Sequence, residues 1–432
     1  MINIQWPQRA TITLIMTGLT LAVFSRAAPA TNGLNLIGFG AESYMMGGAD
    51  LAVARDTSAM NTNPAGLTQI EHRRFDIYSA VAVPGLLRHQ DEFGNDKSVH
   101  GYALLGDLGY AYKLPDRPLH AGLGIFAQGG SGVDYGKVDT AFGTRDELSI
   151  LFRIARITPT LAWKFNEKLS LGVSGVILYS DMKQDFFPNT SYYDPSDPAL
   201  SFFGTRIHGM HTTETGWRLG VMYDLNDRLR LGMAFSSEIN IRLKDGELVS
   251  DQSAIGLGKV TYNKVVASGI NQPQELGAGI AWAVTDRLLI AAEINWLDWS
   301  SAVKTSRLQA SEPEDSAASD LNISSDLNWR DQYVLALGAA YEHGRYIWRA
   351  GFNYARNPVP RSNMSPLLGP VAQYHLTLGA GKQLDSQWRV DGGIEYQFNE
   401  TTTYTNPSLP FGTDTQQDLA MLSFHLQFSR LW

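Results

Sequence analysis

The sequence predicts an all-β protein: a transmembrane antiparallel β-barrel of about fourteen strands, with an N-terminal plug (hatch) of short helices inside the lumen. Three observations support this prediction. Apolar and polar residues alternate along most of the chain after residue 72. Short polar turns alternate with long connections. The segment before the first strand is rich in glycine and poor in charge, as a plug packed inside a barrel requires.

The composition excludes several other classes of protein. The 432 residues are 18% charged and 11% aromatic, and their mean hydropathy is −0.16. After residue 30 the chain has no apolar run of roughly 18 residues, the length that a membrane-spanning helix needs. The absence of cysteine excludes disulfides, thiolate zinc sites and cysteine nucleophiles. The net charge of −8 offers no basic surface for nucleic acid, and we expect no cofactor and no metal.

Residues 1–30 are expected to form a signal peptide. Arg9 precedes an apolar stretch over 10–24, and Ala28-Pro29-Ala30 fits the small-x-small pattern of a cleavage site. The alternative is an anchoring helix, but the stretch is short for one. A signal peptide that is followed by no further apolar helix predicts that the protein is exported and located in the outer membrane of a Gram-negative cell.

Residues 31–72 are expected to form the hatch. A short helix is predicted over 43–54, broken by Gly47-Gly48. Asp56 is a candidate N-cap for a helical turn over 57–61, because its carboxylate can accept unpaired backbone N–H groups. Asn63-Pro64 should end that turn, since proline disfavours the α conformation in the residue before it.

Residues 73–432 are expected to form the barrel. The alternation is clearest at 388–399, where Trp388, Val390 and Ile394 share one face and Arg389 and Asp391 the other. Comparable apolar faces begin and end with Trp or Tyr, which is typical of the aromatic belts at a membrane interface. Segments of this kind begin near residues 73, 99, 119, 151, 169, 212, 229, 275, 288, 330, 346, 373, 388 and 418.

The lengths of the connections support this count independently. Tight turns such as 166–168, 226–228, 285–287 and 342–344 alternate with long loops. The long loops are predicted near 84–98, 137–150, 186–211, 246–274, 303–329, 357–372 and 399–417. Short periplasmic turns and longer outer loops are typical of outer-membrane barrels.

Several motifs then resemble those of the FadL/TodX family of outer-membrane transporters. Gly47-Gly48-Ala49, Asp56 and Asn63-Pro64-Ala65-Gly66-Leu67 are similar to the plug signature of that family. Barrel motifs follow in the usual order, namely Trp296-x-x-Trp299-Ser300, Asn328-Trp329-Arg330-Asp331, Trp348-Arg349-Ala350-Gly351 and Asn357-Pro358-Val359. The resemblance implies a passive, non-enzymatic channel for long-chain fatty acids or aromatic and alkane hydrocarbons. It also implies capture by outer loops and lateral release through a kink in the third strand.

A kink is independently predicted in the third strand. Gly129, Gly130 and Gly132 lie within four residues, and such a run favours a bulge over a regular strand. We interpret these residues as a lateral gate. The alternative is a strand end that runs into a loop.

Two connections carry unusually many apolar residues for outer loops. A large exposed apolar patch usually marks a binding surface, so we expect these residues to form an outer capture groove. The alternative is that they pack the loops together or contact lipopolysaccharide. The predicted groove residues are Phe186, Phe187, Tyr192, Tyr193, Leu200, Phe202, Phe203, Ile255 and Leu257.

Four cations are predicted on lumenal faces: Arg156, Arg218, Arg349 and Arg389. Any of them offers a partner for a fatty-acid carboxylate, although ordinary ion pairing, as between Arg389 and Asp391, is the favoured role. A neutral hydrocarbon would need no cation.

Two other functions stay open at this point. A general porin-like pore for polar solutes is the main alternative. A barrel hydrolase is the second, with His208 or His211 as a base, but no acid-rich motif lies nearby. The expected partners are a hydrophobic ligand and outer-membrane lipid and lipopolysaccharide, and the expected state is a monomer. The acidic stretch Glu312-Pro313-Glu314-Asp315 is expected to be a solvated outer loop that divalent cations can bridge to lipid A.

Overall fold

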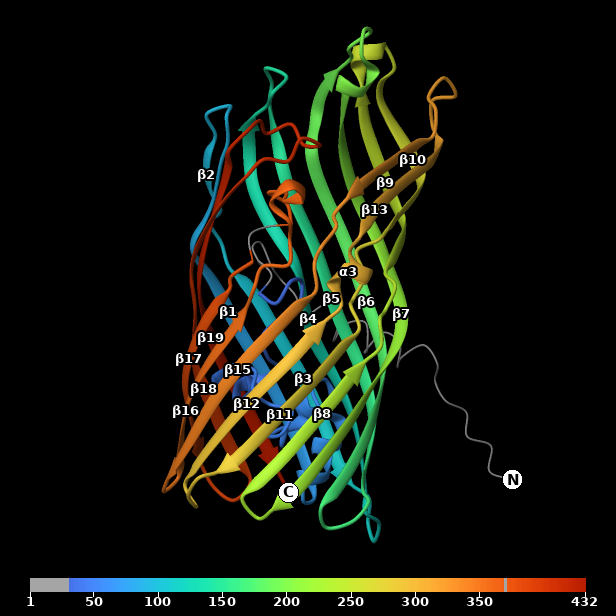
Figure 1. The fold of residues 1–432 in the computed structure, drawn as a ribbon. Helices are drawn as coiled ribbons and strands as arrows, with labels where there is room; N and C mark the ends of the chain where they lie inside the picture. The colour runs from blue at the N-terminus through green and yellow to red at the C-terminus, as the bar shows by residue number, and fades with distance from the viewer. Residues whose placement is uncertain (1–30, 369–370) are drawn as a thin grey trace, which may run out of the picture.

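The computed structural model describes residues 31–368 and 371–432, and it shows a tall closed barrel with a small helical segment inside its lower half (Figure 1). The predicted signal peptide, 1–30, lies outside the described residues. Among the described residues, no helix is long and apolar enough to cross a membrane.

The barrel wall confirms the predicted fourteen antiparallel strands. Each strand pairs with its neighbour along the wall, and β19 pairs with β1 to close the ring. Closure of the ring removes the two free edges that an open sheet would expose to lipid. Within the described residues the wall strands are β1 (Arg73–Gln90), β3 (Ala103–Lys113), β4 (Leu119–Asp139), β5 (Arg145–Lys164), β6 (Leu169–Tyr192), β7 (Phe202–Asn226), β8 (Leu229–Ser236), β11 (Glu275–Ala283), β12 (Leu288–Leu297), β15 (Gln332–His343), β16 (Tyr346–Ala355), β17 (Tyr374–Gln383), β18 (Trp388–Tyr404) and β19 (Thr415–Leu431).

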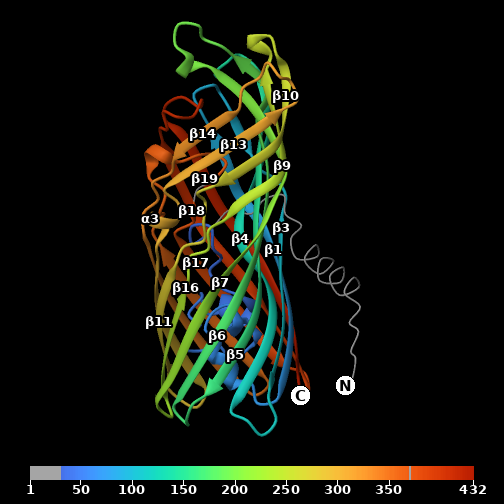
Figure 2. The same cartoon turned by 90° about the vertical axis from the view of Figure 1, so that its right-hand side faces the viewer.

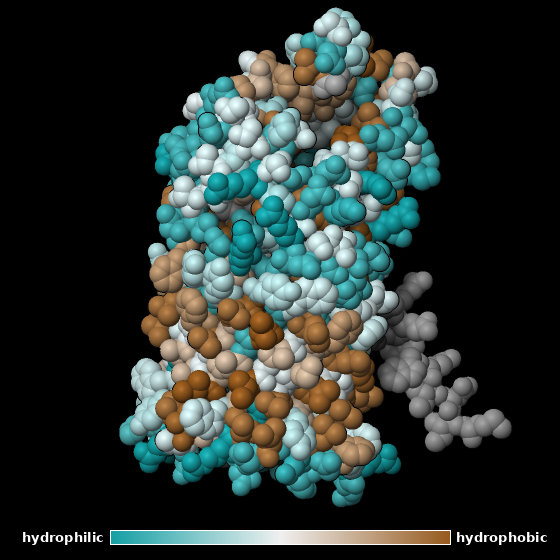
Figure 3. Space-filling model, viewed as in Figure 1, coloured by the Kyte–Doolittle hydropathy of each residue, from teal (hydrophilic) through white to brown (hydrophobic). Residues whose placement is uncertain are grey.

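Alternation between lipid and lumen explains the strand pattern. On β19, Phe424, Leu426 and Phe428 are 46–49% exposed, whereas His425 and Gln427 between them are buried in the lumen. Comparable apolar side chains on the other strands form a belt around the lower part of the barrel (Figure 3). The side-chain period of two therefore reflects membrane lipid on the outer side of the wall and the hatch on its inner side.

The predicted long loops are only partly loops, which corrects the sequence analysis. Strands β4 to β7 continue far above the belt, so 137–150 and 186–211 are mostly strand, and β5 and β7 begin at residues 145 and 202. Most of the regions 246–274 and 303–329 form additional strands of the same sheet, in the upper part of the molecule (Figure 2). Above the membrane the outward face of a strand meets water and carries polar residues, while its apolar residues point into the lumen, so the apolar outward face that reveals a wall strand is absent. The additional strands are β2 (Asp96–Ser98), β9 (Arg242–Gln252), β10 (Gly258–Ser268), β13 (Thr305–Pro313) and β14 (Leu321–Asp326).

The hatch consists of short helices separated by tight turns. Helix α2 (Gly40–Met45) begins and ends earlier than predicted, because Gly47 and Gly48 with positive φ turn the chain just after it. The 3₁₀ helix η1 (Thr57–Met60) is capped by Asp56, as predicted, and η2 (Pro64–Gln69) by Asn63. Other short helices are η3 (Pro198–Leu200), η4 (Ser253–Ile255), α3 (Trp299–Ala302) and η5 (Arg361–Asn363).

The aromatic motifs of the barrel meet next to the N-terminal end of the hatch. Trp299 is fully buried, and its ring lies edge-on to Trp329 with the centroids 5.3 Å apart. The Trp299 indole N–H donates to Gln332 Oε1 at 3.2 Å. A Cβ on Gly33 would come within 2.5 Å of the Trp299 ring, so Trp299 packs directly against the N-terminal part of the hatch.

Candidate functional site: hatch, kink and lumen

The base of the hatch is held to the wall by buried ion pairs. Arg349 of β16 contacts Glu42 at 3.1 Å and Asp391 of β18 at 2.9 Å. Arg55 of the hatch contacts the same Glu42 at 2.7 Å. Burial by itself raises the pKa of Glu42, but the guanidinium groups of Arg55 and Arg349 outweigh it and hold that pKa well below its usual value. Glu42 is therefore an anion clamped between hatch and wall.

The predicted plug residues make close contacts with the wall. Asn353 Nδ2 donates to the Gly47 carbonyl at 2.9 Å, and a Cβ on Gly351 would lie 2.1 Å from Gly47 N. Only a glycine-on-glycine contact allows this approach of two backbones. Gly48 turns the chain beside it.

Asn63 performs a similar role at the other end of the hatch. Its Oδ1 accepts from Ala65 N at 3.2 Å and caps η2, while Pro64 occupies the first position of that helix. Its Nδ2 donates to the carbonyls of Leu51 and of Val221 in β7, at 2.7 and 3.1 Å. One amide thus joins two parts of the hatch to the wall.

The predicted glycines lie on β4, the third wall strand, where the pairing is irregular. Gly129 and Gly130 have φ of +143° and +133°, and the register of β4 against β5 shifts between Ala127 and Gly129. Side chains rarely adopt such φ values, and a Cβ on Gly130 would meet the Phe152 carbonyl at 2.0 Å. Gly132 lies just beyond, in register with Leu151.

The pairing of β4 with β3 ends at this point. Asp107 and Phe126 form the last pair between the two strands, although β4 continues to Asp139. Farther up, β3 remains paired only with β1. The wall therefore has a break between β3 and β4 just above Phe126.

The N-terminal part of the hatch pairs with β4 at this break. Asn35 forms an antiparallel bridge with Gly129, and Gly130 N donates to the Leu34 carbonyl at 3.0 Å. Leu36 N donates to the Gln128 carbonyl at 3.4 Å. Residues 34–36 thus take the pairing position that β3 leaves.

Asp107 is a residue that the sequence analysis missed. Its two carboxylate oxygens accept from Ala127 N of β4 and from Gly40 N of the hatch, both at 3.1 Å. It therefore replaces a regular β3–β4 hydrogen bond and joins three segments. The sequence signal that could have identified Asp107 is a carboxylate on the inward face of the strand that precedes the glycine run.

A small cavity lies beside the break. Its lining is mainly apolar, with Leu34, Leu36, Leu105, Leu151 and Phe152, and a polar edge at Glu395 and Gln397. The cavity measures about 40 Å³, room for about two water molecules.

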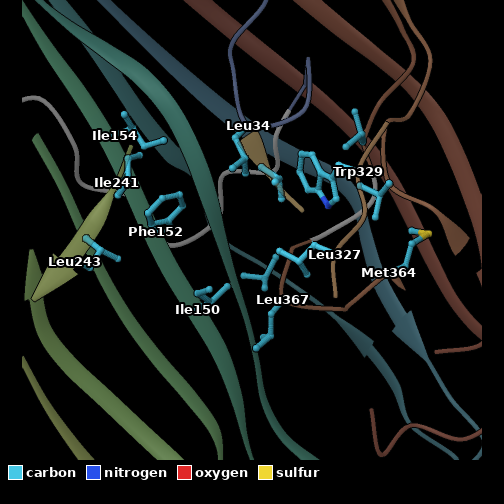
Figure 4. Close-up of a cluster of buried hydrophobic side chains, with 14 of the residues drawn as sticks. Leu34, Ile150, Phe152, Ile154, Ile241, Leu243, Leu327, Trp329, Met364 and Leu367 are labelled. Atoms are coloured by element: carbon cyan, nitrogen blue, oxygen red, sulfur yellow. The ribbon is translucent and has the colours of Figure 1, made fainter. Parts of the chain in front are cut away.

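Above this cavity the lumen is apolar. Figure 4 shows Leu34 of the hatch among inward side chains from β5 and β9 and from the loops before β15 and β17. Ser131 Oγ donates to the Leu367 carbonyl at 3.0 Å, so the loop before β17 folds into the barrel against β4. The labelled residues of this lumenal cluster are Leu34, Ile150, Phe152, Ile154, Ile241, Leu243, Leu327, Trp329, Met364 and Leu367.

The four predicted lumenal arginines are all inward, but their partners differ. Arg349 and Arg389 both contact Asp391, and Arg218 contacts Glu275 at 3.3 Å. Arg156 contacts only amide oxygens, Gln272 Oε1 at 2.9 Å and Asn61 Oδ1 at 3.4 Å. Among the described residues, Arg156 is therefore the one of these four without a carboxylate partner.

The predicted groove residues lie around the top of the β6–β7 hairpin and in the segment that precedes β10. Tyr192, Tyr193, Leu200 and Ile255 are 42–60% exposed. Phe187 is fully buried and stacks on Phe186, so it supports the tip without being accessible itself. Phe202 stacks on Phe142 at 4.7 Å, a contact that the sequence did not suggest. Phe203 and Leu257 are half-buried beside these residues.

The barrel wall, the internal hatch and the apolar lumen define a class of protein, an outer-membrane channel with a plugged interior. A family model described as "Outer membrane protein transport protein (OMPP1/FadL/TodX)" matches residues 25–428, and the chain belongs to this family. It is an outer-membrane transport protein and not an enzyme, as the sequence analysis predicts.

Individual relatives are distant. The chain is 23% identical over 288 residues to a "Long-chain fatty acid transport protein" of Salmonella typhi, which covers 62% of this chain and 64% of that one, just under two thirds. It is 21% identical to the protein of the same description from Escherichia coli O6:H1, covering 82% and 84%. The crystal structure of the Pseudomonas putida toluene transporter TodX shares the fold, with a TM-score of 0.77, 18% identity and coverage of 93% and 100%.

Proposed function

We propose that this protein takes up hydrophobic compounds, long-chain fatty acids or aromatic and alkane hydrocarbons, and releases them sideways into the membrane. The relatives named for fatty acid and toluene transport supply the two ligand classes. The observation that carries the proposal is the break between β3 and β4, which adjoins an apolar cavity and is covered by hatch residues 34–36.

Lateral release follows from the energetics of the ligand. Moving apolar surface from water into an apolar phase gains roughly 25 cal/mol per Å². A ligand that left through the periplasmic end would lose this gain. A ligand that left between β3 and β4 would keep it, because exposed apolar side chains such as Leu108 and Leu123 flank that seam on the lipid side.

Capture is assigned to the exposed tip of the β6–β7 hairpin. Tyr193 and Leu200 present apolar surface to solvent, and the stacked rings of Phe142, Tyr192 and Phe202 support them. Deletion of 193–201 should weaken ligand binding while the barrel still assembles, because these residues lie between the end of β6 and the start of β7. Unchanged binding would remove the capture assignment.

Arg156 is the best candidate partner for a ligand carboxylate. It is buried in the lumen, and its hydrogen-bond acceptors are two neutral amide oxygens. A carboxylate is a stronger acceptor for a guanidinium than a neutral amide, so an anionic ligand would improve these contacts. Arg156→Gln should reduce uptake of a fatty acid about tenfold, since a hydrogen bond to a charged group contributes about 1.5–3 kcal/mol. Uptake of toluene should be unchanged.

The matched control is Arg389→Gln, which removes a lumenal cation that already contacts Asp391. Equal loss of fatty acid and toluene uptake in the Arg156 variant would assign Arg156 to the structure of the hatch instead. Mass spectrometry of hydrophobic compounds that co-purify with the protein identifies the ligand class directly.

The porin-like alternative is tested by liposome swelling. The hatch occupies the lower lumen (Figure 2) and is held there by buried ion pairs, which supports a closed pore. Sugars should therefore enter liposomes containing the intact protein no faster than control liposomes. Rapid sugar entry would contradict the proposal.

A further inference from the structure

Exposed cations form a cluster on the outside of the barrel wall, on the opposite face from the lumenal site. The four members are Lys183 on β6, Arg242 and Lys244 on β9, and Arg307 on β13. At the start of β9, Leu243 and the preceding Ile241 alternate with these cations and point into the lumen (Figure 4), so Arg242 and Lys244 point outward. We call these four residues the outer basic cluster.

Strand pairing brings these residues together. Arg242 and Arg307 both pair with Ser268 of β10, one from each side. Two strand spacings separate them, which corresponds to about 10 Å. Lys244 pairs with His211 of β7 and lies two residues from Arg242 on the same face, about 7 Å away.

A groove on the outer face of β5, β6 and β7 extends the cluster. A bulge at His208-Gly209, where Gly209 has φ of +75°, opens the wall opposite Lys183. The groove is lined by Arg153, Tyr179, Asp181, Lys183, His208 and His211.

The cluster carries an excess of positive charge. Arg153 contacts Asp181, and His208 lies 3.6 Å from Glu247, so these acids already have partners. Asp245 is exposed between Lys244 and Gly246. In the described part of the chain, none of the four cluster residues has a carboxylate within 4.0 Å. Four unpaired cations held on adjacent strands would repel one another in the absence of an anion.

The position of the cluster indicates which anion it meets. Along β6 and β7 the exposed apolar residues end at Ile177 and Trp217, and His211 and Lys183 follow higher on the same outward faces. Figure 3 shows strongly hydrophilic residues directly above the apolar belt. This height is that of the headgroups of the outer leaflet, since aromatic residues such as Trp217 mark the interface.

We propose that the outer basic cluster and its groove bind the phosphorylated headgroup of the outer-leaflet glycolipid, lipopolysaccharide. Arginine and lysine are the residues that pair with phosphate oxygens, arginine through two parallel hydrogen bonds. The contact is direct, in contrast to the divalent bridge expected for the acidic stretch 312–315. Glu312 there already contacts Lys264 at 3.4 Å.

The test compares two charge-matched variants of the full-length protein in detergent. The first carries Lys183→Gln, Arg242→Gln, Lys244→Gln and Arg307→Gln. The second carries Lys168→Gln, Arg228→Gln, Arg287→Gln and Arg345→Gln, which lie in exposed turns at the opposite end of the barrel. Binding of diphosphorylated lipid A, of dephosphorylated lipid A and of inorganic phosphate is measured by native mass spectrometry.

Wild-type protein and the turn variant should both retain diphosphorylated lipid A, and the cluster variant should bind it at least about tenfold more weakly, because each cation near an anionic lipid surface contributes roughly fivefold. Dephosphorylated lipid A should bind weakly to all three. An equal loss of lipid A binding in both variants would mean that binding depends only on net charge, and it would overturn the proposed site. Full displacement of lipid A by millimolar phosphate would show a phosphate site without lipid specificity and would also overturn the proposal.

Discussion

The two ends of the hatch are attached to the barrel in different ways. The base is fixed by side chains from distant strands, as Arg349 with Glu42 and Asn353 with Gly47 illustrate. The N-terminal part, residues 34–36, pairs with β4 through backbone groups of Gln128, Gly129 and Gly130. Buried ion pairs are costly to break, whereas a short backbone bridge is not. We therefore propose that the base is the permanent closure and that the N-terminal part is the element that moves to admit a ligand.

The largest expected effect comes from changing the kink itself. Gly130→Val should reduce uptake of an apolar ligand at least about tenfold, because a β-branched residue cannot hold φ of +133° and drives β4 back towards a regular strand. Uptake is measured with radiolabelled ligand in cells that contain equal amounts of each variant.

The matched control is Gly175→Val on β6, where φ is not positive and a Cβ would meet nothing closer than 3.5 Å. This variant should transport normally. If both variants transport as well as the wild type, the kink does not serve as an exit.

The next effect tests the fixed base. Arg349→Met leaves Glu42 and Asp391 without their shared cation, which should lower the free energy of unfolding by roughly 3–5 kcal/mol. It should also let sugars leak through the lumen. Urea unfolding and liposome swelling measure the two consequences.

Arg88→Met provides the comparison, because Arg88 forms an ion pair with Asp96 that is exposed to solvent. This change should leave both readings as in the wild type. A barrel that stays sealed and equally stable without Arg349 would mean that the base is not held by its charges.

The smallest effect concerns pH. Burial raises the pKa of Asp50 in the hatch to about 7, and a hydrogen bond from Ser43 offsets part of this rise. The folded protein therefore binds a proton that the unfolded chain releases near pH 4, so the associated stability is complete below about pH 4 and is lost as the pH rises through about 7. Glu293, Glu275 and Arg218 line the same polar cavity.

Asp50→Asn should remove this dependence, because an amide resembles the neutral acid. Hydrogen exchange of residues 40–54 should rise between about pH 6 and pH 8 in the wild type and change less in the variant. If hydrogen exchange varies equally with pH in the wild type and the variant, a titratable group other than Asp50 causes the pH dependence.

The sequence was sufficient for the wall, because lipid outside and a polar or hatch-filled lumen inside impose a period of two. In the hatch it was sufficient for the Asp56 cap and for the turn at the glycine pair, which are local signals. It placed the first hatch helix too late in the chain, and it interpreted Asn63-Pro64 as the end of a turn where Asn63 instead caps the next helix. It was not sufficient for the strands above the membrane, because their outward faces are polar and lack the apolar lipid-facing side chains that mark the wall. It also missed Asp107 and the pairing of 34–36 with β4, because these contacts join residues far apart in the chain.

The central claim, that residues 34–36 must leave β4 for a ligand to pass, is tested most directly by fixing them there. The amide side chains of Asn35 and Gln128 lie 3.5 Å apart, and the chain has no cysteine of its own, so Asn35→Cys with Gln128→Cys introduces one defined disulfide. The control pair is Thr401→Cys with Asp418→Cys, which are paired on β18 and β19. Uptake of an apolar ligand should stop when the first pair is oxidised and return on reduction, and the control pair should transport in both states. Equal uptake by the oxidised and reduced forms of the first pair would contradict the account.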